Sequence, residues 1–234
     1  MKIRALACLF FVASLAAFSF GQGTVVVVDP TVPAKDNTLS AADQRLIDRY
    51  ALPKFKAKFE SDTCPVELEP AGTVSGAFTK TGAVQKLAFF QVCQTGNGLG
   101  IVGLVLIENG KVVGTYASDS GWSVDIGVLP DINQNGVGEF TLSFGGGMHQ
   151  GQGGTGVDIM EFSGGLPKGI GWFKSEEFTD TDLSNAWKVT AKPGKAPLYY
   201  KQRFTAVSEN KWRRVGAVTA LKLGKTISTF EVVK

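Results

Sequence analysis

The 234-residue chain contains one histidine, three cysteines and only 19% charged residues. A single histidine excludes the familiar zinc hydrolase sites, which use two or three imidazoles. That residue, His149, lies in a glycine-rich stretch and has no serine or cysteine partner nearby in the sequence. The cysteines form no C-x-x-C pair, which argues against a redox function. The composition therefore favours a protein without catalytic activity.

Long apolar runs are also scarce, and the one present is at the N-terminus. A short basic start precedes an apolar run from Ala5 to Phe20, which is shorter than the roughly 20 residues of a membrane span. Ala17, Ser19 and Gly21 are small residues of the kind found before a signal-peptidase cut. We predict a cleaved signal peptide at residues 1–21 and a secreted or periplasmic mature chain without a transmembrane segment. An uncleaved anchor is the alternative.

Removal of residues 1–21 leaves two cysteines, Cys64 and Cys93. An even pair in an exported chain predicts a disulfide, here closing a loop of about 30 residues. Two buried free thiols are the alternative.

Glycine is abundant instead: 29 of 234 residues, against a usual share of about 7%. This favours turn-rich β structure. One helix is predicted at residues 41–52, with Ser40 as its N-cap and Pro53 after its end. The alternating residues 54–59 fit either an edge strand or a further helical turn.

Short apolar runs separated by glycine follow from residue 74 onwards. Asn109-Gly110 is a strong signal for a type I′ hairpin turn. The predicted strands are residues 86–93, 101–108, 111–117, 122–129, 139–144, 157–162, 187–191, 198–204 and 215–223. The chain is therefore predicted to be mainly β.

An internal repeat is visible within these strands. Residues 77–90 align without a gap on residues 131–144, placing Gly136 opposite Gly82 and Glu139 opposite Gln85. A period near 50 residues suits the four antiparallel strands of a propeller-like blade; chance alignment is the alternative. We expect an N-terminal helix and lead at residues 22–73, two degenerate β repeats at 74–165 and a basic β segment at 166–234.

One motif carries chemistry, the sequence DINQNGVGE at residues 131–139. Oxygen-bearing side chains occupy its first, third, fifth and ninth positions, as Asp131, Asn133, Asn135 and Glu139. Calcium takes six to eight oxygen ligands, and the Val137 carbonyl adds another. Leu142 stands where an EF-hand needs a bidentate glutamate. The alternative to calcium is an Asx-rich turn closed by its own hydrogen bonds.

The 131–139 loop and the strand predicted after it resemble the calcium loop of FG-GAP and VCBS-type repeats, found in integrin-α-like β-propellers. The resemblance implies a structural calcium ion held by Asp131, Asn133, Asn135, the Val137 carbonyl and Glu139. Asparagine replaces aspartate twice, so the loop carries a formal charge of −2 in place of −4. Binding is therefore expected to be weak, suited to calcium levels outside cells. The earlier repeat has lost these ligands.

The remaining candidates are two acidic residues and the four tryptophans, and their pattern in the sequence points to a function less clearly. Asp158 and Glu161 are three residues apart on a predicted strand, which puts them on opposite faces and argues against a glycosidase pair. The tryptophans could stack on sugars or simply pack. They are Trp122, Trp172, Trp187 and Trp212.

Charge is unevenly distributed along the chain. Residues 184–234 contain 11 Lys and Arg and 2 Asp and Glu, whereas residues 22–183 contain 11 and 19. This asymmetry indicates either an anionic partner, such as an acidic polysaccharide, lipid head group or protein at the envelope, or docking of the basic segment on an acidic one. Nucleic acid is not expected. We predict a non-catalytic, calcium-stabilised binding module; a carboxylate-based secreted hydrolase and a structural envelope subunit are the alternatives.

Overall fold

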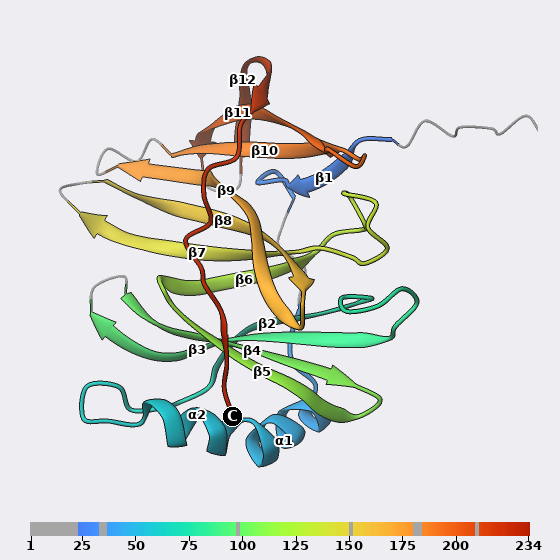
Figure 1. Ribbon diagram of the computed structural model, residues 1–234. Helices are drawn as coiled ribbons and strands as arrows, with labels where there is room; N and C mark the ends of the chain where they lie inside the picture. Colours follow the sequence, from blue (N-terminus) through green and yellow to red (C-terminus); the bar gives the residue numbers. More distant parts are fainter. Residues whose placement is uncertain (1–22, 33–36, 97–98, 150–151, 180–183, 209–210) are drawn as a thin grey trace, which may run out of the picture.

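The computed structural model describes residues 23–32, 37–96, 99–149, 152–179, 184–208 and 211–234, without the side chains at 146–149, 152 and 179. The proposed signal peptide lies outside these residues. The prediction of a mainly β chain is confirmed (Figure 1). The helices are α1 (Ala41–Tyr50) and α2 (Leu52–Phe59). The strands are β1 (Val25–Val28), β2 (Glu69–Gly76), β3 (Gln85–Gly96), β4 (Leu99–Glu108), β5 (Lys111–Ser120), β6 (Trp122–Val128), β7 (Phe140–His149), β8 (Gln152–Ser163), β9 (Leu166–Thr179), β10 (Asn185–Lys192), β11 (Leu198–Ser208), β12 (Lys211–Leu221) and β13 (Glu231–Val232).

The strands form two antiparallel sheets. One has the order β13-β5-β4-β3-β2, and the other has the order β12-β11-β10-β9-β8-β7-β6, with β1 paired to β10. Within them, β2 to β5 and β6 to β9 are each a run of four sequential neighbouring strands. These runs are parts of two larger sheets, so a propeller arrangement of separate blades is not confirmed.

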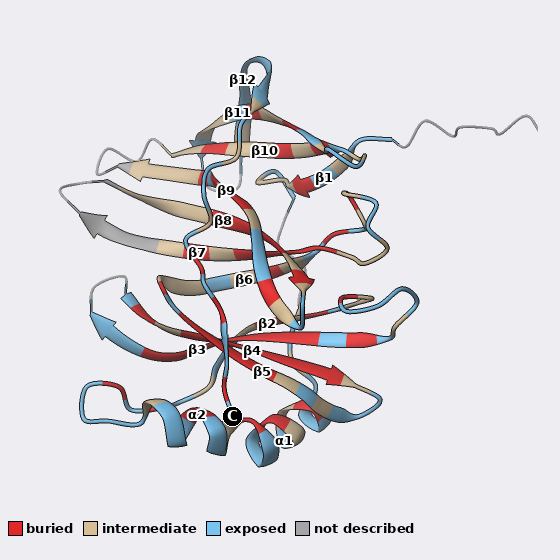
Figure 2. Ribbon diagram, in the orientation of Figure 1, coloured by how far each residue is buried: buried red, intermediate tan, exposed pale blue. Residues whose placement is uncertain are grey.

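The main core lies where the two sheets meet. Phe89 of β3 and Phe144 of β7 pack edge to face with ring centroids 5.7 Å apart, and Phe78 packs in the same way on Phe140 at 5.8 Å. Edge-to-face contacts of this kind add about 0.5–1.5 kcal/mol to the burial of each ring. The buried centre of the molecule therefore joins the two four-stranded runs (Figure 2).

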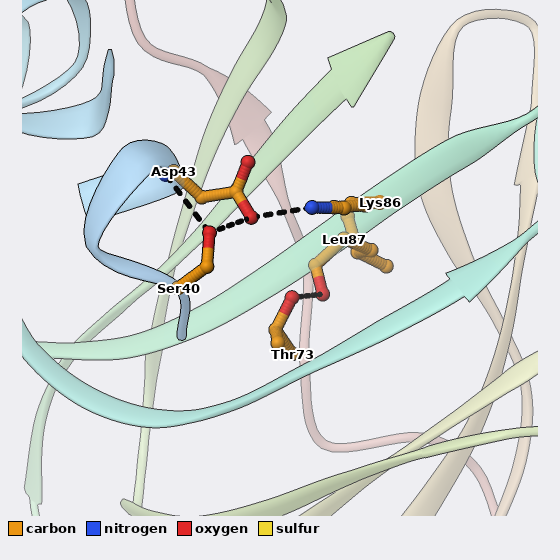
Figure 3. A network of polar contacts seen from close by, with 5 residues as sticks. All are labelled: Ser40, Asp43, Thr73, Lys86 and Leu87. Atoms are coloured by element: carbon orange, nitrogen blue, oxygen red, sulfur yellow. Dashed lines mark hydrogen bonds and ion pairs between the residues drawn. The ribbon is translucent and has the colours of Figure 1, made fainter. Parts of the chain in front are cut away.

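The helices cover the other face of the five-stranded sheet. The Ser40 side chain accepts a hydrogen bond from the Asp43 backbone N–H at 3.1 Å, as predicted for the N-cap. Asp43 in turn accepts a bond from Lys86 of β3 at 2.6 Å (Figure 3). Residues 54–59 belong to α2, so the helical alternative for them is correct, and Phe55 is fully buried against the sheet.

The predicted disulfide between Cys64 and Cys93 is present. It links the segment after α2 to β3, beneath the helices. Because it closes a loop of 29 residues, it stabilises the fold by about 3 kcal/mol through the unfolded chain. The alternative of two free thiols is wrong.

The eight-stranded sheet divides at β10. This strand pairs with β9 only at Asn185 and Ala186, whereas β1 pairs with it from Val189 to Ala191. A separate core cluster fills the space between β1, β8, β9, β10 and β11. The basic strands β10 to β12 therefore form their own layer at one end of the molecule (Figure 1).

Residues 222–230, here called the C-terminal strap, run from β12 across both sheets toward the helices (Figure 1). The strap lies on β9 at Gly171, where a Cβ atom would stand 2.6 Å from the Leu223 Cβ atom. The buried Asp158 side chain of β8 accepts backbone hydrogen bonds from Ile227 at 3.3 Å and from Ser228 at 3.0 Å. The strap ends with Phe230 in the main core, so it fastens the two sheets together.

Candidate functional site

The 131–139 loop is closed by hydrogen bonds to its own backbone. Asp131 accepts from the N–H groups of Asn135 at 2.9 Å and Gly136 at 2.8 Å. Glu139, which is 1% exposed, accepts from Ile132 at 2.8 Å and Asn133 at 3.1 Å. Gly136 has a φ of 95°, which permits the tight bend. This geometry is that of the Asx-rich turn.

The same arrangement occurs 54 residues earlier. The Gln85 side chain accepts from the N–H groups of Phe78 and Thr79, each at 3.0 Å, as Glu139 does from Ile132 and Asn133. Gly82 has a φ of 73°, also in the left-handed region. The sequence alignment of residues 77–90 with 131–144 thus pairs residues that make the same hydrogen bonds and the same backbone turn in the two loops.

The two loops also bind each other. The Thr81 hydroxyl donates to the Gly136 carbonyl at 2.6 Å, and the Gly138 N–H donates to the Ala77 carbonyl at 2.9 Å. The Ile132 carbonyl accepts from Gly194 at 2.9 Å, in the turn between β10 and β11. The 131–139 loop is therefore a junction between the two four-stranded runs and the basic layer.

Glu161 of β8 is the side chain at this loop that sequence reasoning missed. Its Oε2 atom accepts from the side-chain amides of Asn133 at 2.8 Å and Asn135 at 2.6 Å. Burial, with the charges of Glu139 and Glu161, raises the pKa of the neighbouring Tyr199 to about 12. A third carboxylate therefore faces the loop from a neighbouring strand, a relation that no local spacing reveals.

The donor chemistry at this loop suits a calcium ion. The side chains of the loop that could coordinate a metal offer oxygen atoms as ligands. A carboxylate oxygen that accepts one hydrogen bond from an N–H still has a free lone pair for the ion. No three His, Cys, Asp or Glu side chains within the described ranges gather as a metal cluster, so amide and carbonyl oxygens would have to complete the set. The residues that would hold the ion are Asp131, Asn133, Asn135, the Val137 carbonyl and Glu139.

Asp158 and Glu161, considered above as a possible glycosidase pair, are engaged in different places. Asp158 binds the C-terminal strap, and Glu161 binds the asparagines of the 131–139 loop. Their contacts agree with their expected positions on opposite faces of β8. They do not form a catalytic pair in this fold.

The basic segment is the second candidate site. Among the described residues, only Lys188 of the 11 cations in residues 184–234 forms an ion pair, with Asp29 at 2.6 Å. Most of the others are exposed on the layer of β10 to β12 or on the strap. The exposed cations are Lys192, Lys195, Arg203, Lys211, Arg213, Arg214, Lys222, Lys225 and Lys234. Docking of the basic layer onto acidic residues therefore accounts for little of its charge.

Two hollows lie on either side of Trp172. The larger one, here called the glycine groove, has a volume of about 690 Å³ and is bordered by β7, β8, β9 and the β5–β6 corner. The smaller one, here called the tryptophan–lysine pocket, has a volume of about 410 Å³ and lies between β9, β10, β11 and the start of the strap. Both are lined by Trp172, Lys174 and Glu177. Strand β9, absent from the sequence predictions, supplies all three.

His149, the one imidazole, is the last residue of β7, and its side chain is outside the described set. Val157 lies in a strand, so no helix follows the glycine-rich stretch as a phosphate-cradling loop requires.

Over the described part of the chain, no helix is both long and apolar enough to span a membrane. Comparisons with protein families, with curated proteins and with solved structures give no match.

Proposed function

We propose that this chain is an exported, non-catalytic binding protein that holds an anionic polymer on the layer formed by β10, β11 and β12. The observation that carries the proposal is the set of exposed, unpaired cations on that layer. Cations left without carboxylate partners create a positive potential that attracts polyanions. An acidic polysaccharide at the cell envelope is the partner that agrees with export.

Retention on a heparin-like polysaccharide over a series of salt concentrations tests this proposal. The double variant Lys211→Gln and Arg213→Gln removes two exposed charges of β12, and it should elute at clearly lower salt than the wild type. The matched control, Lys54→Gln and Lys56→Gln, removes two exposed charges from α2 at the other end of the molecule. Equal shifts in both variants, or no retention at low salt, would contradict the proposal.

The proposal includes a weak structural calcium ion at the 131–139 loop, and with it the kinship to FG-GAP repeats. The support is the set of oxygen atoms that the loop offers as ligands, from the side chains of Asp131, Asn133, Asn135 and Glu139 and from the Val137 carbonyl. Chelator should lower the melting temperature of the wild type, and Asp131→Ala should remove that sensitivity. Asp62→Ala, in an exposed turn, should keep it. Identical melting curves of the wild type with and without chelator would show that the loop holds no stabilising calcium ion.

One observation favours a second candidate, a carboxylate-based hydrolase. Asp119 and Glu177 both line the glycine groove, so a polymer lying there would contact two acids. If the groove hydrolyses a polysaccharide, new reducing ends should accumulate with time, and Asp119→Asn should stop their release. A constant number of reducing ends would leave binding as the function.

A further inference from the structure

We infer that the tryptophan–lysine pocket binds one anionic sugar unit of the polymer, such as a uronic acid. The inference rests on the proposed function and gives it a specific subsite. The pocket has a volume of about 410 Å³, within the range of small-molecule sites. Its lining combines two indole rings, Trp172 and Trp187, with lysines from three different parts of the chain.

The Trp172 ring is held in place before any ligand binds. A Cβ atom at Gly156 would stand 3.0 Å from the Cε2 atom of the ring, and one at Gly224 would stand 3.4 Å from its Cε3 atom. The Trp172 backbone also pairs with Gly224 through two hydrogen bonds, of 3.0 Å and 2.8 Å. Two glycines thus allow the ring to lie tightly between strand β8 and the strap. A fixed ring loses little entropy when a flat apolar face packs on it.

Trp187 lies on the same face of the sheet as the charged residues of β11. It is directly opposite Arg203, while Lys201 is opposite Val189, two residues further along β10. Side chains at directly opposite and diagonal positions of an antiparallel pair are within reach of one another. The second indole of the pocket therefore has one cation directly opposite it and another at a diagonal position on β11.

The lysines of the pocket are not equivalent. The Lys174 ammonium group binds the Glu177 carboxylate at 3.0 Å, so this pair is close to neutral. Lys201 and Lys222 have no carboxylate within ion-pair distance among the described side chains. A ligand carboxylate or sulfate in the pocket would meet these two free cations.

Glu177 favours a sugar over a phosphate polymer as the occupant. A carboxylate accepts hydrogen bonds and donates none, so it pairs with the hydroxyl groups that sugars carry. The phosphodiester or polyphosphate backbone has no such donor, so the Glu177 carboxylate offers it no hydrogen bond. Indole rings, free cations and one acceptor together match a ring with an apolar face, a carboxylate and hydroxyl groups.

Calorimetric titration with a galacturonic acid tetramer tests the inference. The comparison ligands are a neutral sugar tetramer and a polyphosphate of similar charge. We expect the uronate to bind more tightly than both, and Trp187→Ala to weaken it by about tenfold or more. Trp212→Ala, on β12 and outside the pocket lining, is the matched control and should bind as the wild type does. Lys201→Gln with Lys222→Gln tests the pocket without altering its aromatic packing.

The outcomes separate this inference from the proposed function. Retention on the heparin-like column should persist in Trp187→Ala, because the exposed cations of β12 are unchanged. If the column retains the protein but the uronate binds no better than polyphosphate, or binds Trp187→Ala and the double lysine variant as it binds the wild type, the inference is wrong and the proposed function stands. If the column retains no form of the protein, the proposed function itself fails.

Discussion

Asp158 offers the sharpest test of how the C-terminal strap holds the two sheets together. The side chain is fully buried on β8, and it accepts hydrogen bonds from the backbone of Ile227 and from both the backbone and the hydroxyl group of Ser228. Asp158→Ala would remove all of these acceptors while the strap remains fixed at Phe230. The Ser228 N–H would then be buried without a partner.

The magnitude follows from these contacts. A buried N–H left unsatisfied costs about 1–3 kcal/mol, and a lost hydroxyl bond costs about 0.5–1.5 kcal/mol. The Ile227 N–H is only partly buried and adds less. We therefore expect Asp158→Ala to lower the free energy of unfolding by about 3 kcal/mol, and Asp158→Asn by about 1–2 kcal/mol because its amide oxygen still accepts one bond.

Charge adds a pH dependence of known sign. Burial raises the pKa of Asp158 above its usual value of 3.8, although the bonds from Ser228 and Ile227 oppose the shift. The folded chain therefore binds this proton more tightly than the unfolded chain. Stability gained from this group is lost as the pH rises through the folded pKa, and it is fully present below the unfolded value. The stability advantage of the wild type over Asp158→Asn should thus grow as the pH falls from 7 toward 4.

Urea unfolding followed by tryptophan fluorescence measures these differences. Asp119→Ala changes an exposed aspartate of β5 and should stay within about 0.5 kcal/mol of the wild type. Limited trypsin digestion at Lys222 or Lys225 would show release of the strap in Asp158→Ala before global unfolding. Equal unfolding free energies and equal digestion rates for Asp158→Ala and Asp119→Ala would show that Asp158 does not hold the strap in place.

Three further predictions concern the loops, the strap and the disulfide. Glu139→Gln should cost less than about 1 kcal/mol by urea unfolding, because Gln85 makes the same two bonds in the equivalent loop, whereas Glu139→Ala should cost about 2–3 kcal/mol; equal costs would contradict this equivalence. Gly171→Ala should destabilise the chain by more than about 1 kcal/mol, since its methyl group would meet Leu223 of the strap, while Gly194→Ala, in open space, should not. Cys64→Ser with Cys93→Ser should lower the unfolding free energy by about 3 kcal/mol, and a change below about 1 kcal/mol would show that the bond does not constrain the unfolded chain.

Local signals in the sequence were sufficient for much of the fold. Ser40 and Asn109-Gly110 specify their own cap and turn, since the groups that form them are adjacent in the chain. Asn109 and Gly110 do adopt positive φ angles, of 51° and 69°. The alignment at an offset of 54 residues also led to the two loops that now prove to share one hydrogen-bond arrangement.

The errors arose where distant segments decide the outcome. Strand β9 contains Pro167, Gly169 and Gly171, residues that usually interrupt strands. The structure has room only for glycine at the last two positions, because Thr226 and Leu223 of the strap lie against them. Strand β1 exists through its pairing with β10, at the far end of the chain. Residues 54–59, for which an edge strand and a further helical turn were both left open, form a helix because Phe55 is buried against the sheet. None of these contacts is visible in a local window.

The candidate site divides in the same way. The ligand residues of the 131–139 loop could be named from spacing, and the excess of cations from charge counting. Glu161, Lys201 and Lys222 could not be assigned, because they reach their sites from β8, β11 and the strap. The pocket contains two tryptophans and two unpaired lysines from segments that are far apart in the sequence, so only the folded structure shows that they lie together.

The most direct test of the central claim is the salt concentration at which the mature protein leaves a heparin-like column. We predict retention at low salt, release that depends steeply on ionic strength, and a clear loss of retention in Lys211→Gln with Arg213→Gln but not in Lys54→Gln with Lys56→Gln. A protein that passes through the column at low salt, or one that loses retention equally in both double variants, would contradict the assignment of polyanion binding to the β10–β12 layer.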